Sequence, residues 1–271
     1  QDGDSLRTIY THLDGWESSL VIPPEAKKGT EFSEDSLWYW PGDCFVEGGK
    51  LKVFMSSFIQ ATPGNWGFKW TGTSLATFSL PEIRLERLDN IPSASEKEVH
   101  YGHAVCDDDP DHTYIYGAGE DKKPYVARAP KGDILADWEY FNGEGWVGDP
   151  LKAMPMADYN GSEQFSVFKY GDKYVYMTQV GGFVGEIRSF ISDKPYTGWE
   201  NEKLLYDVPQ PQGDSNLFAY NAVAHPQFLE DDALLVSYCV NSFSLEDLFG
   251  DASKYRPVFI RIPVSMILDS E

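Results

Sequence analysis

The sequence predicts an all-β fold, a five-bladed β-propeller, from three observations. Turns built from Gly, Asp and Pro recur about every 60 residues. Each turn lies between two runs rich in β-branched and aromatic residues, as a β-hairpin requires. A further apolar run follows each hairpin and ends at or near a proline, which cannot donate to a sheet ladder and so marks the end of a strand. The turns are Gly48-Gly49, Asp109-Pro110, Gly171-Asp172 and Asp231-Asp232.

The runs that end at proline are the expected third strands of four repeated units. They cover residues 76–80, 125–129, 188–191 and 258–262. Outer strands over residues 83–88, 138–141 and 204–208 would complete the four-stranded blade of a propeller. The alternative is an ordinary β-sandwich whose turn spacing is regular by chance.

The repeat divides residues 1–271, taken as a single domain, into four full blades and a remainder. The blades cover residues 37–92, 93–150, 151–212 and 213–271, and residues 1–36 form a partial blade with candidate strands at 8–11 and 19–22. A closed ring tolerates no unpaired sheet edge. We therefore expect five blades, one of them incomplete, shared between the termini or begun by strands upstream of Gln1.

The composition and the net charge of the chain limit the classes of molecule that it is expected to bind. With 42% hydrophobic and 15% aromatic residues the chain can bury a large β-rich core, and no run of 18 apolar residues is present. A formal net charge of -21 repels phosphate backbones and anionic lipid, which excludes nucleic acid and membrane surfaces as favoured partners. From the predicted β-rich globular class of the chain we expect a secreted or periplasmic protein.

The acidic runs and the cysteines indicate no cofactor. Asp107-Asp108-Asp109 and Glu230-Asp231-Asp232 are typical of solvated hairpin tips, although carboxylates also suit calcium. Cys44, Cys106 and Cys239 form no metal or CxxC spacing and fall in the expected inner hairpins, where a free cysteine behaves as a small buried hydrophobe. Their odd number leaves at least one thiol unpaired. We expect that no cofactor is required and no metal site is formed, with a central calcium ion left open.

In a propeller the innermost strand of each blade lines the central channel. The expected inner strands cover residues 38–43, 100–105, 160–167 and 220–228. Asp43, His103 and His225 lie five or six residues before their hairpin turns, and Glu163 lies about eight before. Because strand side chains alternate, an offset of two keeps Glu163 on the same face as the histidines.

These side chains suit a sugar. Aromatic faces stack on sugar rings, and amides, imidazoles and carboxylates bond to hydroxyls. Glycosidic cleavage needs two carboxyl groups flanking the bond, one a general acid with a raised pKa and the other a base or nucleophile, roughly 5–9.5 Å apart. We predict Asp43 and Glu163 as this catalytic pair. The predicted substrate-binding residues are Trp38, Trp40, His103, Tyr220, Asn221 and His225.

Each of these residues has a structural alternative. Asp43 could end its Pro-Gly-Asp turn by accepting backbone N–H groups, and Glu163 could pair with Arg188. His103 and His225 could simply hydrogen-bond carbonyl groups, or His225 could face a central cation. His100 has no recognisable partners and is expected at the surface or in packing, as are His12 and His112.

Residues 38–43, 125–128, 162–167 and 220–226 resemble a family of uncharacterised microbial five-bladed propellers, some of which are endo-acting arabinanases. More distantly they are similar to the arabinanase, xylosidase and invertase group of glycoside hydrolases. The resemblance covers residues 37–264 and implies acidic residues on inner strands as acid and base, which map onto Asp43 and Glu163. It also implies an essential Asp in a first-blade strand, where Asp4 and Asp14 lie in the right region but not in the usual Gly-Asp context.

Two functions therefore follow as hypotheses. The first is a secreted glycoside hydrolase acting on arabinose-, xylose- or fructose-containing glycan. The second is a propeller without catalytic activity that binds glycan or a protein partner. A second carboxylate at the channel mouth would separate them, because binding alone needs no acid and base.

Overall fold

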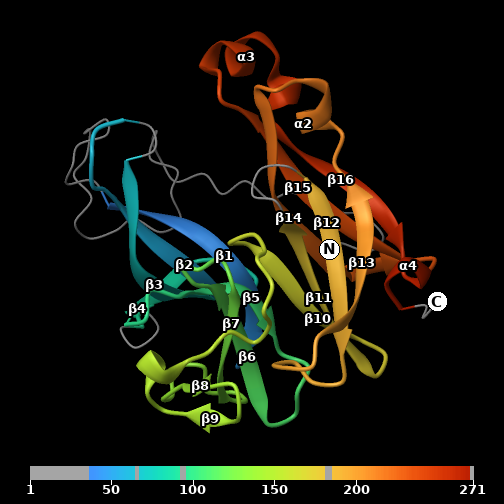
Figure 1. The fold of residues 1–271 in the computed structure, drawn as a ribbon. Coiled ribbons are helices and arrows are strands. Elements are labelled where there is room, and N and C mark those ends of the chain that lie inside the picture. Colours follow the sequence, from blue (N-terminus) through green and yellow to red (C-terminus); the bar gives the residue numbers. More distant parts are fainter. Residues whose placement is uncertain (1–36, 65–66, 92–95, 181–184, 269–271) are drawn as a thin grey trace.

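The structure is a computed structural model that describes residues 37–64, 67–91, 96–180 and 185–268. These residues form four antiparallel sheets, which are blades of a β-propeller arranged around a common centre (Figure 1). The first blade contains β1 (Leu37–Glu47), β2 (Lys50–Gln60), β3 (Phe68–Phe78) and β4 (Leu85–Asn90). The second contains β5 (His100–Cys106), β6 (His112–Ala118), β7 (Pro124–Pro130), β8 (Glu139–Phe141) and β9 (Trp146–Val147).

The other two blades complete the described part of the ring. The third contains β10 (Phe165–Tyr170), β11 (Lys173–Val180), β12 (Glu186–Ser192) and β13 (Glu200–Asp207). The fourth contains β14 (Leu217–Glu230), β15 (Ala233–Ser242) and β16 (Arg256–Pro263). Within each blade, strands that follow one another in sequence pair antiparallel, which confirms the predicted propeller class with four blades in the described residues.

All four predicted turns join the first two strands of a blade. At Gly48-Gly49 both residues have positive φ, +57° and +72°, and Asp231-Asp232 takes the same left-handed conformation at +51° and +56°. Two consecutive residues of positive φ match the right-handed twist of the strands that they connect. The predicted third and outer strands are also present, with ends shifted by at most four residues, except that β3 begins at Phe68, eight residues before the predicted start.

Some predictions fall outside these sheets. The candidate strands 8–11 and 19–22, and with them the partial blade 1–36, lie outside the described residues, as do Asp4 and Asp14. The fifth blade and the division of one domain into blade ranges therefore stay predictions.

The hydrophobic core lies between blades. Phe54 and Leu75 of the first blade pack with Tyr101 and Ile115 of the second. Similar clusters join the second blade to the third and the third to the fourth. A smaller cluster around Met55, which contains neither Phe54 nor Leu75, is built from residues of the first blade and the turn that follows β3. The packing of one apolar sheet face on the next explains why the strands need apolar residues on both faces.

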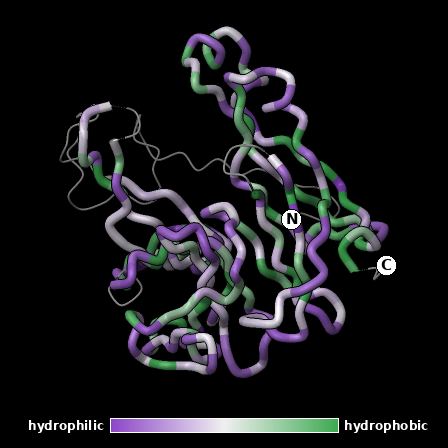
Figure 2. Tube along the Cα trace, in the orientation of Figure 1, coloured by the Kyte–Doolittle hydropathy of each residue, from purple (hydrophilic) through white to green (hydrophobic). Residues whose placement is uncertain are grey.

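The helices are short and lie at the ends of strands. They are α2 (Gln210–Gly213), α3 (Leu245–Gly250) and α4 (Ser265–Leu268), with 3-10 turns η1 (Pro150–Lys152) and η2 (Ala252–Lys254). Among the described residues no helix combines the length and apolar character that a membrane crossing needs. In Figure 2 the hydrophobic stretches largely follow the strands, whereas many connecting loops are hydrophilic.

Candidate functional site

A cavity of about 550 Å³ opens where the inner strands of the four blades meet. Neighbouring inner strands contact one another in the order β1, β5, β10 and β14. The lining is mixed in polarity and comes from all four strands and the β5–β6 turn. It comprises residues 41–44, His103, Val105, Asp108, residues 164–168, Asn221 and residues 223–227.

Three of the predicted site residues lie in β-bulges of these inner strands. The pairing of β1 with β2 shifts between Pro41 and Cys44, which leaves Gly42 and Asp43 opposite one residue. The pairing of β14 shifts in the same way around Asn221, whereas in β5 Gly102 and His103 lie between paired residues with no residue opposite them. A bulge inserts residues into one strand and re-aims the side chain it carries. The cavity thus receives polar side chains that regular alternation would not direct there.

Two glycines permit these bulges to approach each other. A Cβ on Gly42 would lie 2.2 Å from the carbonyl oxygen of Gly102, so that β1 and β5 could not come so close with larger residues. Gly102 has a φ of +100°, and a Cβ there would lie 2.5 Å from Phe54 Cβ. Glycine is the residue that combines positive φ with such close backbone approach.

Asp43 is held by backbone groups of two blades. Its Oδ1 accepts from the N–H of Cys44 at 2.8 Å, and its Oδ2 accepts from the N–H of Val105 at 2.8 Å. Burial raises the pKa of the Asp43 carboxyl above 3.8, against the opposing effect of the two N–H donors. Asp43 is therefore a half-buried carboxyl group in the cavity wall whose proton is held more tightly than usual.

Glu163 lies just before β10 and contacts two histidines of the second blade. Its Oε1 is in direct hydrogen-bond contact with His100 Nδ1 and lies 3.6 Å from His103 Nε2. Burial opposes ionisation of Glu163, but the hydrogen bonds and charges of both histidines outweigh it and hold the pKa of Glu163 well below its ordinary value. Arg188, the alternative partner considered from sequence, pairs instead with Glu186 and Glu202.

The fourth blade contributes Asn221 and His225 to the cavity. Asn221 has a φ of +60°, a left-handed conformation that Asn tolerates better than most residues. The Nε2 of His225 lies 2.7 Å from Ser237 Oγ, so its partner is a hydroxyl rather than the expected carbonyl. Burial lowers the pKa of His225 below 6.5, which favours the neutral imidazole.

The predicted site residues thus fall into two groups. One cavity is lined by Asp43, His103, Asn221 and His225. Glu163 is not part of the lining but contacts the lining residue His103. The lining does not include Trp38, Trp40 or Tyr220. Trp40 packs against Phe58, with ring centroids 4.3 Å apart, and Trp38 belongs to the same aromatic cluster on the first blade. A role of these aromatic residues in substrate binding stays a prediction.

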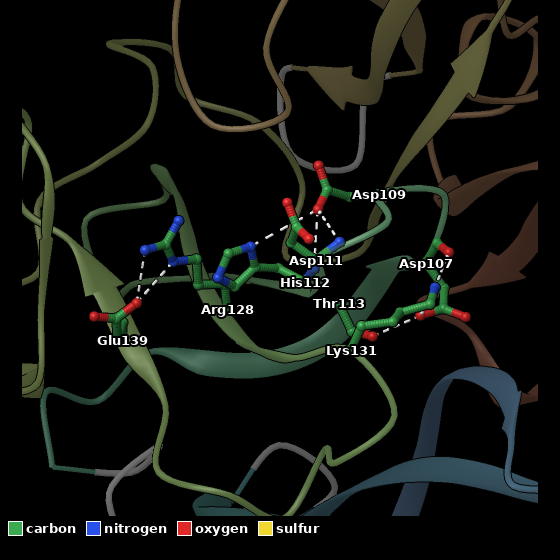
Figure 3. A network of polar contacts seen from close by, with 8 residues as sticks. All are labelled: Asp107, Asp109, Asp111, His112, Thr113, Arg128, Lys131 and Glu139. Atoms are coloured by element: carbon green, nitrogen blue, oxygen red, sulfur yellow. Dashed lines mark hydrogen bonds and ion pairs between the residues drawn. The ribbon is translucent and has the colours of Figure 1, made fainter.

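The acidic β5–β6 turn is more tightly engaged than a solvated tip. Asp107 pairs with Lys131 at 2.7 Å, and Asp109 accepts from the backbone N–H groups of Asp111 and His112 at 2.9 Å (Figure 3). Asp107 and Asp109 therefore have partners within the fold. The remaining residue of the run, Asp108, is exposed and lines the cavity.

Sequence reasoning missed the roles of Asp108 and His100, as well as the cavity positions of Gln164 and Gln227. A glycine inside a predicted strand was the available signal, because it marks a bulge. The expectation that His100 lacks partners is wrong, since it contacts Glu163 and stacks on Trp70 with ring centroids 4.1 Å apart. The cysteines are free as expected, but Cys44 is exposed rather than buried.

The fold and the cavity define a β-propeller with a polar central site. The model of the family described as "Domain of unknown function (DUF5005)" matches residues 1–264, and the chain belongs to this family. No curated protein matches the chain.

Solved structures share the fold. A protein of Bacteroides ovatus ATCC 8483, described as a candidate hydrolase, is 23% identical with a TM-score of 0.71, over 83% of this chain and 61% of that chain. This chain thus spans about three fifths of that protein.

Two further structures are similar over most of the chain. An α-L-arabinofuranosidase of Clostridium thermocellum ATCC 27405 is 14% identical with a TM-score of 0.46, over 82% of this chain and 89% of that one. An α-L-arabinanase of Cellvibrio cellulosa is 12% identical with a TM-score of 0.48, over 82% and 72%. The family match and the Bacteroides ovatus structure confirm the predicted relation to a propeller family at the level of the fold.

Proposed function

We propose that this chain is a glycan hydrolase whose reaction takes place in the cavity between the four inner strands. The observation that carries the proposal is Asp43, a cavity carboxyl whose pKa burial raises. A raised pKa is what a general acid that protonates a glycosidic oxygen requires. The description of the Bacteroides ovatus protein as a candidate hydrolase supports the same class of reaction.

The reaction also needs an ionised carboxylate, and two residues compete for this role. Glu163 is the predicted partner, and its two histidines favour the ionised form. The cavity lining includes Asp108 but not Glu163. Variants of the two residues therefore test two distinct assignments of the base or nucleophile.

Neutral polar groups would bind the sugar hydroxyls. Asn221, Gln164 and Gln227 bring amides to the cavity, and His225 brings an imidazole whose neutral form burial favours. Such a set accepts and donates hydrogen bonds without a strong net charge, as a neutral glycan requires. Trp38, Trp40 and Tyr220 remain proposed sugar platforms outside the cavity lining.

A propeller that binds glycan or a protein without cleaving it is the second candidate. The observation that favours it is the complete engagement of Asp43, since each of its oxygens already accepts a backbone N–H group. A carboxyl group with that role stabilises the contact between two blades and need not react.

Release of reducing sugar from arabinan, arabinogalactan, xylan and fructan tests the proposal. Activity in the wild-type chain that is lost in Asp43→Asn would support the hydrolase. Comparison of Glu163→Gln with Asp108→Asn then identifies the ionised partner. Glycan binding without any release by the wild-type chain would support the second candidate instead.

We also propose that a fifth blade closes the ring between β14 and β1. Among the described residues these are the two ends of the row of inner strands. Phe259, which is 57% exposed on the fourth blade, is an apolar side chain that a fifth sheet would cover. Export from the cytoplasm and a central calcium ion stay predictions, as does the lack of nucleic-acid and membrane partners, which rests on the charge of -21.

A further inference from the structure

Three side chains beside the cavity converge on one point. The candidate ligand atoms of His100, His103 and Glu163 all lie within 4.8 Å of one another. We propose that these residues bind one divalent transition-metal ion of the zinc type. Two imidazole nitrogens and one carboxylate oxygen form a ligand set that zinc accepts, with a fourth position left for water or an oxygen of a ligand.

One pair of ligand atoms lies close to the spacing that such an ion requires. Two ligand atoms at about 2.0–2.2 Å from a tetrahedral zinc ion lie about 3.3 Å apart. His103 Nε2 and Glu163 Oε1 are separated by 3.6 Å, so a shift of a few tenths of an ångström would place both at bonding distance. His100 Nδ1 is in direct contact with the same carboxylate oxygen, which is closer than two ligands of one zinc ion lie, so these two atoms would move apart when the ion binds.

The strongest support for a bound cation comes from the buried imidazole of His103. Its side chain is only 5% exposed, Nδ1 has no hydrogen-bond partner within the described parts of the chain, and Nε2 has only the long 3.6 Å contact with Glu163 Oε1. Buried polar atoms are nearly always bonded, and His225, the other cavity histidine, has Ser237. A metal ion between His103 and Glu163 would supply the missing partner of Nε2.

A shared proton is the competing explanation. A proton between His100 and Glu163 would satisfy those two groups, but it would leave His103 with no partner at Nδ1 among the described residues and only the 3.6 Å contact with Glu163 at Nε2. A metal ion engages all three residues at once. His100 lies at the start of β5, His103 lies in the bulge of β5, and Glu163 lies in the segment before β10. The three ligands are therefore brought together by the packing of two blades and do not belong to one loop.

The surroundings hold the ligands in place. Trp70 stacks on the His100 ring with 25° between the planes, which restricts its rotation. The positive φ of Gly102 and the register shift next to it set the direction of His103, because alternation alone would place residues 100 and 103 on opposite faces. Ligand orientation by neighbouring groups of this kind is typical of metal sites.

The ligand chemistry selects the ion. Calcium prefers oxygen ligands, whereas two of the three groups here are imidazoles. The site therefore differs from the central calcium that the sequence left open. Metal binding would also make Glu163 a ligand and leave Asp108 as the ionised carboxylate that acts with Asp43 in the proposed hydrolysis. Metal binding itself does not rest on that hydrolysis.

Titration of the full chain with metal tests the inference without any glycan. After treatment with a chelator, calorimetric titration with zinc chloride should show one ion per chain, with a Kd of about 1 µM or tighter. Replacement of a ligand in His103→Gln or Glu163→Gln should weaken binding at least about tenfold. His112→Gln and Cys44→Ser are matched controls, because they remove a surface imidazole and the exposed thiol outside the ligand set.

Cobalt gives a second measurement that needs no variant. Co²⁺ bound by two imidazoles and a carboxylate in the wild-type chain should show visible absorption bands that added zinc removes. Absence of stoichiometric binding, tighter binding of calcium than of zinc, or an equal loss in His112→Gln or Cys44→Ser would overturn the inference. Failure of glycan hydrolysis alone would not affect it, since both readouts follow the metal.

Discussion

Asp43 Oδ2 accepts a hydrogen bond from the backbone N–H of Val105 at 2.8 Å and so joins the bulge of β1 to the inner strand of the next blade. The same carboxyl group lines the cavity. Asp43 therefore has a structural role, as an acceptor that links two blades, and a proposed chemical role as a general acid. The chemical role requires the protonated carboxyl group, whereas the structural role requires only its oxygens as acceptors.

The stability of the fold should depend on the ionisation of Asp43. Its pKa in the folded chain is raised above 3.8, mainly by burial. The stability that it contributes is therefore fully present below the unfolded pKa and is lost as pH rises through the folded pKa. We expect the free energy of unfolding of the wild-type chain, minus that of Asp43→Asn, to fall as pH rises from about 3 to 7.

Denaturant titration of both chains at several pH values measures this difference. Asp108→Asn, at an exposed carboxylate of the same cavity, is the control for general effects of lost charge. A difference that stays constant or grows with pH would contradict the raised pKa and weaken the assignment of Asp43 as the general acid.

Gly102→Ala should destabilise the chain strongly. The new Cβ would lie 2.5 Å from Phe54 Cβ, and the residue would keep a φ of +100°. Overpacking and backbone strain together predict a loss of about 2–5 kcal/mol in the free energy of unfolding. Gly171→Ala is the matched control, because Gly171 also has positive φ, +61°, but nothing lies within 4 Å of its Cβ position.

The control should lose only about 1 kcal/mol, the backbone part of the effect. Chemical denaturation of the two variants separates the cost of backbone strain at positive φ from the cost of the steric clash with Phe54. Equal losses would show that β5 and Phe54 move apart easily, and that the close approach of the first two blades is not required for the bulge.

The sequence predicted the architecture because hairpin turns and strand ends are local properties. Gly48-Gly49 and Asp231-Asp232 need a left-handed backbone, and glycine or aspartate next to apolar runs indicates it without knowledge of the tertiary fold. The inner strands and the cavity positions of Asp43, His103, Asn221 and His225 followed from the same repeat.

The partners of these residues could not be predicted in the same way. Alternation assigns side chains to faces only while the register is regular, and β1, β5 and β14 each shift register at a site residue. The contact of His100 with Glu163 joins two blades across 63 residues of sequence, which no local pattern reports. Asp108 looked like its two neighbours in the acidic run, although only those neighbours have ion-pair partners in the described residues.

His225 should make the fold less stable in mild acid. Burial lowers its pKa below 6.5, so its contribution to stability is present above the unfolded pKa and is lost as pH falls toward the folded pKa. The free energy of unfolding of the wild-type chain should therefore fall more between pH 7 and 5 than that of His225→Gln, which cannot titrate. The half-exposed site of His112 provides the comparison variant, His112→Gln, and an identical pH profile in all three chains would contradict the prediction.

Asn221 allows sugar recognition to be separated from backbone strain. Its φ of +60° is easy for glycine and costly for alanine, while both substitutions remove the amide from the cavity. We expect Asn221→Gly to keep the stability of the wild-type chain within about 0.5 kcal/mol and Asn221→Ala to lose about 1 kcal/mol.

If the amide binds a sugar hydroxyl, both variants should weaken glycan binding by a similar factor, about 5- to 10-fold for one neutral hydrogen bond. Calorimetric titration with an arabinose or xylose oligosaccharide, beside thermal unfolding of each variant, measures the two effects separately. Affinity that falls only in Asn221→Ala would instead follow backbone strain, and the polar face of the cavity on β14 would then have no direct role in recognition.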